Sequence, residues 1–307
     1  MPLKPLNLMY EKAFKENYAI GAFNVNSLDF LKVAFEAATE TNSPIIIAAT
    51  MTAAEYVGLE FLAEIVKAGA RKTHVPVALH LDHGSSMDEV KRCISAGFNS
   101  VMIDGSHLPF EENIKVTREV VKYAHPRGIT VEAELGKIGG VEDHISVADK
   151  DASLTNPDQA ADFVNRTGCN SLAIAVGTKH GAFKFSGEVV LAYDRISEIR
   201  RKVKVPLVLH GASAVIPAML EKCNKYGAQI SGAKGVTDSV TREAIKRGIN
   251  KINIDTDLKL TFTSAVREVI ATKPGEFDMR NILTPAWSEI KRVMKEKIHT
   301  LGSANKA

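Results

Sequence analysis

Cysteine is scarce in this sequence, which has only Cys93, Cys169 and Cys223, and no two of them form a Cys-x-x-Cys pair. This spacing argues against a thiolate metal site and fits a reducing compartment. No apolar run approaches the roughly 20 residues needed to cross a bilayer, and the N-terminus has no apolar signal core. We therefore expect a cytoplasmic protein without a membrane partner.

Basic blocks and aromatic-rich RNA-binding motifs are also missing. The formal net charge is +3, and lysine and arginine alternate with aspartate and glutamate along the chain. This pattern is typical of solvated helix faces, so nucleic acid is not the expected partner. No Gly-x-Gly-x-x-Gly motif follows the first apolar run, which weakens the alternative of an open dinucleotide-binding sheet.

Short apolar runs rich in β-forming residues recur along the whole sequence. There are eight: residues 19–25, 44–50, 76–83, 99–104, 129–135, 171–178, 205–211 and 249–255. Segments with helical periodicity separate them, and several of these segments end in glycine. Strands that alternate with helices pair in parallel, so eight such units predict an α/β fold, the (β/α)8 TIM barrel. We expect a single domain over residues 1–307, with extra C-terminal helices at about 276–307.

Polar residues stand at the carboxyl end of nearly every run. They include Asn24, Thr50, Asp82, His83, Asp104, Glu132, Glu134, Thr178, Lys179, His180, His210, Asn253, Asp255 and Thr256. In a parallel barrel these ends converge on one mouth, where catalytic groups lie. Three histidines from three different strands form a candidate zinc site with one coordination position left open for substrate. The carboxylates Asp104 and Glu134 are candidates for a second metal position or for orienting the histidine rings.

The segment HLDHGSS, residues 80–86, holds several of these candidates. Strand alternation predicts that His80 and Asp82 share one face, and that His83 points the other way or begins the next loop. We expect His80 to lie one layer beneath Asp82 as a supporting residue.

Glycine-rich turns after the sixth to eighth runs indicate a phosphate site. Gly181 and Gly211 offer backbone N–H groups, and Ser213 and Thr256 add hydroxyl groups where many such barrels bind phosphate. Lys184 is a candidate to pair with the phosphate.

The motifs together resemble those of the class II, metal-dependent fructose-bisphosphate aldolases, specifically the shorter bacterial subgroup. The matching stretches are GAFNV, PVALHLDHG, SVMIDGSHLPFEEN, VEAELGKIGGVEDH, GTKHGAFK, PLVLHGAS, KINIDTDL and LGSANKA. The resemblance implies a lyase that reversibly cleaves fructose 1,6-bisphosphate to dihydroxyacetone phosphate and glyceraldehyde 3-phosphate. The alternative is the sister activity on tagatose 1,6-bisphosphate. Asp255 favours fructose, because the tagatose enzymes commonly carry alanine there.

The resemblance also implies roles for individual residues. It assigns Asp82 as the catalytic acid/base and Glu142 as a proton-transfer residue. It assigns five side chains to metals: His83, His180 and His210 to the catalytic Zn2+, and Asp104 and Glu134 to a second divalent metal. It also implies that dihydroxyacetone phosphate, with Na+ or K+ nearby, is contacted by Gly181, Gly211, Ala212, Ser213, Asn253, Asp255 and Thr256.

The remaining substrate contacts concern both ends of the sugar bisphosphate. Lys184 matches a phosphate-loop position, and Thr50 stands near the second phosphate. Asn24, at the end of the first run, belongs to the same substrate-binding set. Arg280 matches an arginine that reaches this phosphate from a neighbouring subunit, which implies a homodimer or homotetramer.

Three positions depart from the family pattern. Residues 50–53 replace a glycine-bearing turn, Lys179 stands where a small residue is usual, and GASAVIP at 211–217 is one residue longer than the family's GAS-x-x-P.

Rival functions fit the sequence less well. A lysine imine needs a lysine inside the barrel; the first seven runs carry none, and Lys251 is expected near the start of the eighth strand, away from the mouth. Barrel metal-dependent hydrolases usually have His-x-His after the first strand, where this chain has Phe23-Asn24. A phosphate-sugar binding protein has little use for a mouth lined by carboxylates.

Overall fold

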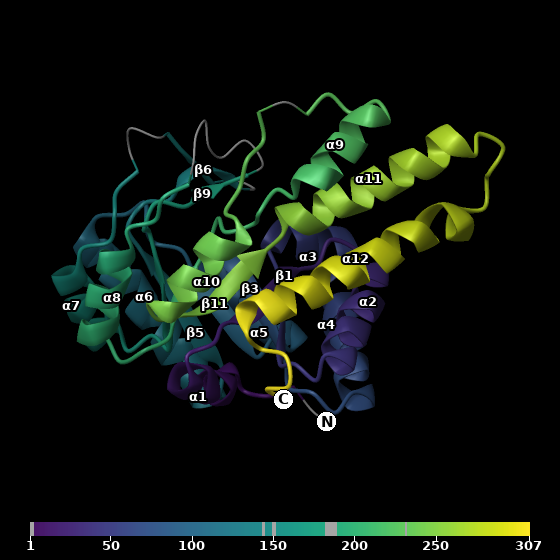
Figure 1. Cartoon of the computed structure of the whole chain (residues 1–307). Helices are drawn as coiled ribbons and strands as arrows, with labels where there is room; N and C mark the ends of the chain where they lie inside the picture. Colours follow the sequence, from purple (N-terminus) through teal and green to yellow (C-terminus); the bar gives the residue numbers. More distant parts are fainter. Residues whose placement is uncertain (1–2, 143–144, 149–151, 182–188, 231) are drawn as a thin grey trace.

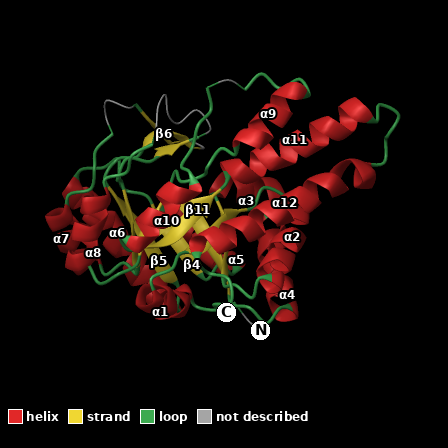
Figure 2. Ribbon diagram, viewed as in Figure 1, coloured by secondary structure: helices red, strands yellow, loops and turns green. Residues whose placement is uncertain are grey.

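Eight parallel strands close into a barrel in the computed structural model, which describes all residues except 1–2, 143–144, 149–151, 182–188 and 231 (Figures 1 and 2). The strands are β1 (Ile20–Asn24), β2 (Ile45–Ala49), β3 (Val77–Gly84), β4 (Ser100–Ile103), β5 (Thr130–Leu135), β8 (Ser171–Ile174), β10 (Leu207–Leu209) and β11 (Ile249–Ile254). Their order is β1-β11-β10-β8-β5-β4-β3-β2, and β1 also pairs with β2, which closes the ring. Every predicted run forms one barrel strand, so the (β/α)8 prediction is confirmed.

Helices surround the barrel, with their apolar faces against the strands. Those before the C-terminal pair are α1 (Leu6–Glu16), α2 (Leu28–Glu40), α3 (Met51–Val57), α4 (Leu59–Lys72), α5 (Met87–Ala96), α6 (Phe110–Ala124), the 3-10 turn η1 (His125–Arg127), α7 (Pro157–Thr167), α8 (Tyr193–Lys202), α9 (Pro217–Lys225) and α10 (Asp238–Lys246). Local signals set their ends. The Ser86 side chain accepts a hydrogen bond from the Glu89 N–H at the start of α5, and Gly97 ends that helix with φ +109°.

Helix α1 closes the amino-terminal end of the barrel. Its residues Leu6, Met9 and Tyr10 are buried in one cluster with Ile46 and Ala78 from β2 and β3. This plug leaves the carboxyl ends of the strands, at the opposite end of the molecule in Figure 1, as the open mouth.

A small sheet of β6 (Gly139–Glu142), β7 (Ile145–Val147) and β9 (Lys179–His180) lies at this mouth (Figure 1). Glycines allow its close packing: a Cβ on Gly140 would lie 2.4 Å from the carbonyl oxygen of His180, and one on Gly211 would lie 2.5 Å from that of Lys179. The segments that follow β5, β8 and β10 therefore meet above the barrel.

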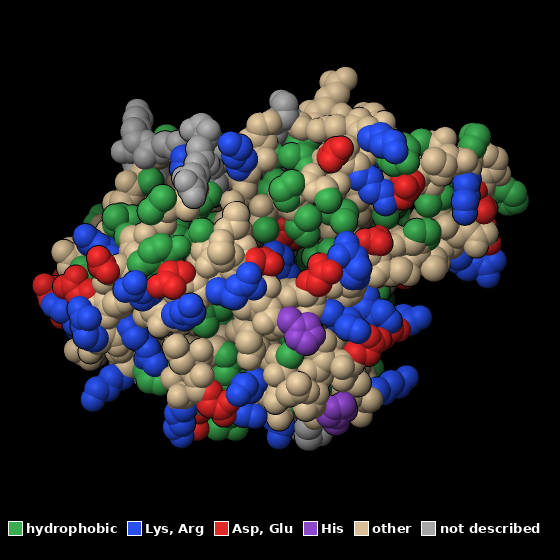
Figure 3. Space-filling model, in the orientation of Figure 1, with side chains coloured by type: hydrophobic (Ala, Val, Ile, Leu, Met, Phe, Trp, Pro, Cys, Tyr) green, Lys and Arg blue, Asp and Glu red, His purple; other side chains and the backbone are tan. Residues whose placement is uncertain are grey.

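The C-terminal helices α11 (Thr256–Thr272) and α12 (Met279–Leu301) run side by side and project from the barrel as an arm, with α9 packed on α11 (Figure 1). The division into one domain with a helical extension stays a prediction. Figure 3 shows acidic and basic side chains mixed over the face in view. Within the described part of the chain, no helix is long and apolar enough to span a membrane.

Candidate active site at the barrel mouth

The barrel brings three predicted histidines together. His83 is the last residue but one of β3, His180 lies in β9 and His210 follows β10, and all three side chains are buried. The ring centroid of His83 lies 4.5 Å from that of His210 and 5.1 Å from that of His180. The centroids of His180 and His210 are 6.3 Å apart. Residues from three separate segments of the chain, as far apart as positions 83 and 210, thus form one cluster.

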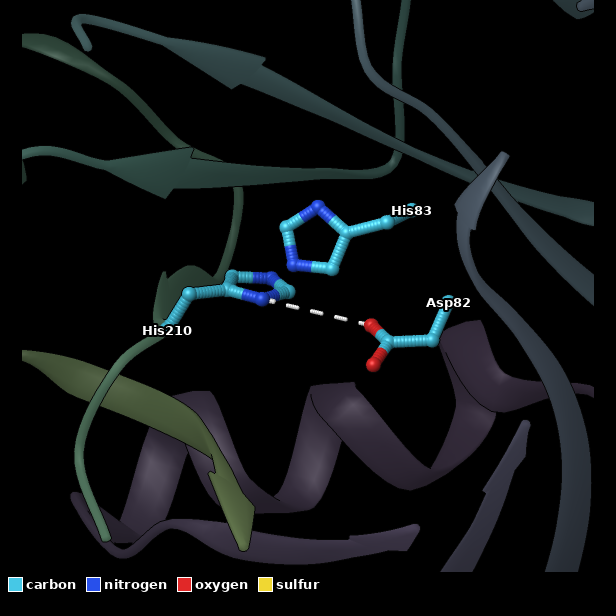
Figure 4. Close-up of side chains that lie close together, drawn as sticks. All are labelled: Asp82, His83 and His210. Carbon is cyan, nitrogen blue, oxygen red and sulfur yellow. Dashed lines mark ion pairs between the residues drawn. The ribbon is translucent and has the colours of Figure 1, made fainter. Parts of the chain in front are cut away.

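Asp82 and His83 both face this cluster, so the prediction that they point in opposite directions is wrong (Figure 4). His83 has a left-handed φ of 48°, and the pairing of β3 with β4 shifts register between Leu81 and Gly84. Such an irregularity breaks strand alternation and turns the next side chain towards the same side. The strain of a left-handed histidine is the kind of distortion that collects at functional sites.

Two overlapping groups of side chains have the spacing of a metal site. One consists of Asp82, His83 and His210, and the other of His83, Asp104 and Glu134; within each group the potential ligand atoms lie within 4.8 Å of one another. His180 belongs to neither group, although its ring lies beside that of His83.

The hydrogen bonds of His210 fit a metal ligand. Its Nε2 lies 2.8 Å from Oε1 of Glu132, an ionised carboxylate that can only accept, so we assign the ring proton to Nε2. Nδ1 is then a lone pair; it is buried and has no hydrogen-bond partner among the described residues. Burial, together with the charge of His83, lowers the pKa of His210 and so favours the neutral ring that a metal requires.

His83 and its carboxylates form the second side of the cluster. Nδ1 of His83 lies 3.2 Å from Oδ2 of Asp104. Burial alone would lower the pKa of His83, but the charge of Asp82 and the bond to Asp104 outweigh it and raise this pKa to about 9. Burial and the neighbouring charge of Asp104 raise the pKa of Glu134. Burial would raise the pKa of Asp104 as well, but its hydrogen bond to His83 lowers it below the usual value. Two buried carboxyl groups side by side, one of them ionised, are a suitable environment for a divalent cation.

Asp82 is held by two amide side chains. Asn24 Nδ2 donates to Oδ2 of Asp82 and Asn253 Nδ2 donates to Oδ1, each at 2.8 Å. Burial would raise the pKa of Asp82, but the neighbouring positive charge of His83 lowers it well below its usual value. The carboxylate is therefore ionised and fixed in position, with Oδ1 3.9 Å from Nδ1 of His210.

A buried ion pair beneath the histidines was not predicted. Lys251 lies inside the barrel, with Nζ 2.9 Å from both oxygens of Glu132 and 3.3 Å from Nε2 of His80. Lys251 is near the start of β11, below the mouth, as predicted, but its side chain is buried inside the barrel and contacts Glu132, which itself holds His210. His80 does lie one layer down, as predicted, and its Nδ1 is 2.7 Å from Oγ of Ser100. The sequence did contain a signal for this position. Lys251 and Asn253 are two residues apart in β11, so strand alternation places both side chains on the same face, inside the barrel.

The predicted phosphate residues meet at the ends of β10 and β11. Ser213 Oγ accepts a hydrogen bond from the Asp255 N–H at 3.2 Å, and Asp255 stands at the N-cap of α11, directly before Thr256. Gly211 adopts a left-handed φ of 62°, and Ala212 is buried beside it. On the neighbouring segment Gly181 has a φ of 83°.

The remaining predicted site residues are Thr50, Lys184, Glu142 and Arg280. Thr50 is the buried N-cap of α3, where its hydroxyl accepts from the Ala53 N–H. Lys184 lies outside the described residues, and so does the side chain of Glu142, whose backbone is in β6. Arg280 lies in the first turn of α12 at the outer end of the arm, where it pairs with Asp278 (Figure 1).

The fold and the buried histidine–carboxylate mouth define a barrel enzyme of the metal-dependent kind. A family profile described as "Fructose-bisphosphate aldolase class-II" matches residues 4–306. The chain is 47% identical to a fructose-bisphosphate aldolase of Helicobacter pylori strain J99 over 296 residues, 96% of each protein. It is 46% identical to that of Thermus caldophilus, over 96% of this chain and 97% of the relative. The crystal structure of the YdjI aldolase from Escherichia coli K12 matches with a TM-score of 0.82 and 35% identity over 100% of both chains. This chain belongs to the class II fructose-bisphosphate aldolase family.

Proposed function

We propose that this protein is a lyase that reversibly cleaves fructose 1,6-bisphosphate into dihydroxyacetone phosphate and glyceraldehyde 3-phosphate, a step of glycolysis and gluconeogenesis. The observation that carries the proposal is the full-length match to the family and to relatives named for this activity. Tagatose 1,6-bisphosphate, which differs in configuration at C4, is the less favoured substrate because Asp255 stands in the NIDT motif. The cytoplasm is the proposed location.

The proposed catalytic metal is Zn2+, held by His83, His180 and His210. The lone pair on Nδ1 of His210 and the carboxylate on its other nitrogen support this assignment, since zinc-bound histidines usually have such a partner. A bound zinc ion supplies Lewis-acid stabilisation of the negative charge that develops on the substrate carbonyl oxygen during cleavage. Asp104 and Glu134 are the proposed ligands of a second divalent cation. A monovalent cation, Na+ or K+, is proposed beside the substrate phosphate.

Asp82 is the proposed base for cleavage. Its ionised oxygen accepts the proton of the substrate C4 hydroxyl, the C4–O bond becomes the aldehyde carbonyl, and the electron pair of the C3–C4 bond remains on the dihydroxyacetone phosphate half. Asn24 and Asn253 hold the carboxylate in place with one hydrogen bond to each oxygen, which leaves lone pairs to accept the hydrogen of the substrate hydroxyl. We assign to Glu142 the subsequent return of a proton to C3.

The substrate phosphates are assigned to two sides of the mouth. Gly181, Lys184, Gly211, Ala212, Ser213, Asn253, Asp255 and Thr256 are proposed for the dihydroxyacetone phosphate end. The N-terminus of α11 and the hydroxyl groups that meet there support this placement. Thr50 is proposed for the other phosphate.

Arg280 is proposed to act on the second phosphate of a partner subunit in a homodimer or homotetramer. Its side chain is 86% exposed in the first turn of α12. That end of α12 lies away from β6 and β9 at the mouth (Figure 1).

A coupled assay that compares fructose and tagatose 1,6-bisphosphates, with and without a chelator, tests the function. We expect faster turnover of the fructose substrate, loss of activity after metal removal and recovery when zinc is returned. Activity that survives complete metal removal and is trapped by borohydride would show imine chemistry and refute the proposal. Preference for tagatose bisphosphate would refute only the substrate assignment.

A further inference from the structure

The loop between β10 and α9 adopts a strained conformation directly after the proposed phosphate residues. Val215 has a φ of 53°, in the left-handed region that β-branched residues avoid, and its side chain is only 2% exposed. This residue lies in the segment GASAVIP, residues 211–217, which is one residue longer than the related motif. A strained loop keeps its conformation only where surrounding contacts hold it.

Asp257 makes such a contact. Its Oδ2 accepts a hydrogen bond of 2.9 Å from the Ala214 N–H, between Ser213 and the strained Val215. Asp257 is fully buried in the first turn of α11. A second hydrogen bond, from the backbone N–H of Val236 to the carbonyl oxygen of Ser213 at 3.0 Å, holds the same loop from the other side.

Lys297 of α12 completes the support. Its side chain is only 11% exposed, and Nζ lies 2.8 Å from Oδ1 of Asp238 and 3.4 Å from Oδ2 of Asp257. It therefore links the first turns of α10 and α11 to α12. These three helices lie near one another beside the barrel (Figure 1). The ammonium group contacts the same carboxylate oxygen that holds Ala214, so it orients that oxygen and balances its charge.

We propose that Lys297 and Asp257 are positioning residues for substrate phosphate, because they hold the loop of Gly211, Ala212 and Ser213 in its binding conformation. This inference rests on the proposed function, in which that loop binds the dihydroxyacetone phosphate end. Neither side chain touches substrate: Asp257 acts through the Ala214 backbone, and Lys297 acts through Asp257.

A purely structural role makes a different prediction. An aspartate in the first turn of a helix stabilises that helix through its dipole. In that case, losing the pair lowers stability without a selective effect on phosphate binding.

Lys297→Met in the full-length, zinc-loaded enzyme separates the two roles. We expect KM for fructose 1,6-bisphosphate, and the inhibition constant of inorganic phosphate, to rise on the order of tenfold, as for loss of a charge-assisted contact. The value of kcat should change less than about twofold, because the phosphate is held equally in the ground and transition states. Zinc affinity, from chelator competition, should not change.

Lys295→Met is the matched control, because Lys295 is in the same helix but pairs with Glu40 on the surface at 2.7 Å. We expect its KM and phosphate inhibition to equal those of the wild type. Unchanged KM and phosphate inhibition in Lys297→Met, or a fall in kcat alone, overturns the inference.

Asp257→Asn provides a second test if Lys297→Met folds poorly. It should raise KM and the phosphate inhibition constant in the same way, and the double variant should be no worse than the more affected single variant, since both act along one path. Additive effects would show that the residues act independently and would refute the chain of contacts. A wild-type enzyme without aldolase activity would instead refute the proposed function.

Discussion

Replacing Glu132 with glutamine tests the buried network beneath the histidines. Glu132 and Lys251 are 1% and 0% exposed, and the lysine Nζ lies 2.9 Å from both carboxylate oxygens. Glutamine keeps the shape of the side chain but leaves Lys251 as a buried charge without a counterion. Breaking a buried pair in this way costs about 3–5 kcal/mol, out of a typical unfolding free energy of about 5–15 kcal/mol.

The double variant Glu132→Gln with Lys251→Met separates charge balance from shape. It removes both charges, so no unpaired charge stays buried, and we expect it to regain most of the lost stability. Zinc affinity should behave differently. Both variants lack the carboxylate that holds His210 Nε2 at 2.8 Å, so both should bind zinc roughly 10–100-fold more weakly.

Urea unfolding of the metal-free proteins measures the first effect, and chelator competition measures the second. Glu40→Gln is the surface control, because Glu40 pairs with the partly exposed Lys291 and Lys295 at the surface and its loss should cost less than about 1 kcal/mol. Two results refute the reasoning: a Glu132→Gln protein as stable as the control, or a double variant whose zinc affinity returns to that of the wild type.

Three further predictions concern single residues at the mouth and on the arm. Asp82→Ala should lower turnover by about 10²–10⁴-fold in the coupled assay while its metal analysis still shows bound zinc; loss of the zinc would instead make Asp82 a ligand. The pKa of His83 is raised to about 9 from an ordinary value of 6.5, so its charged form stabilises the metal-free fold fully below about pH 6.5. That contribution is lost as pH rises through 9, and urea midpoints should fall over this interval in the wild type but not in His83→Asn. Arg280→Ala should raise KM with little change in the oligomer measured by light scattering; a normal KM would remove Arg280 from the site.

Much of the architecture followed from local sequence patterns. Apolar runs of strand length alternate with segments of helical period, and this alternation leaves parallel pairing through crossovers as the favourable arrangement. The same pattern located the mouth, because parallel strands all end on one side. His180 and His210 were therefore predicted to lie near His83 although their separation in sequence is large.

Only the tertiary structure decided how neighbouring residues divide their contacts. The direction of His83 depends on a left-handed backbone and a register shift against β4, and strand alternation in the sequence contains neither. The pairing of Lys251 with Glu132 depends on which inward-facing residues meet when the barrel closes. Lys297 reaches Asp257 because α12 packs back beside α10 and α11. The sequence by itself determined which chemical groups stand at the strand ends, while long-range packing determined which of them touch.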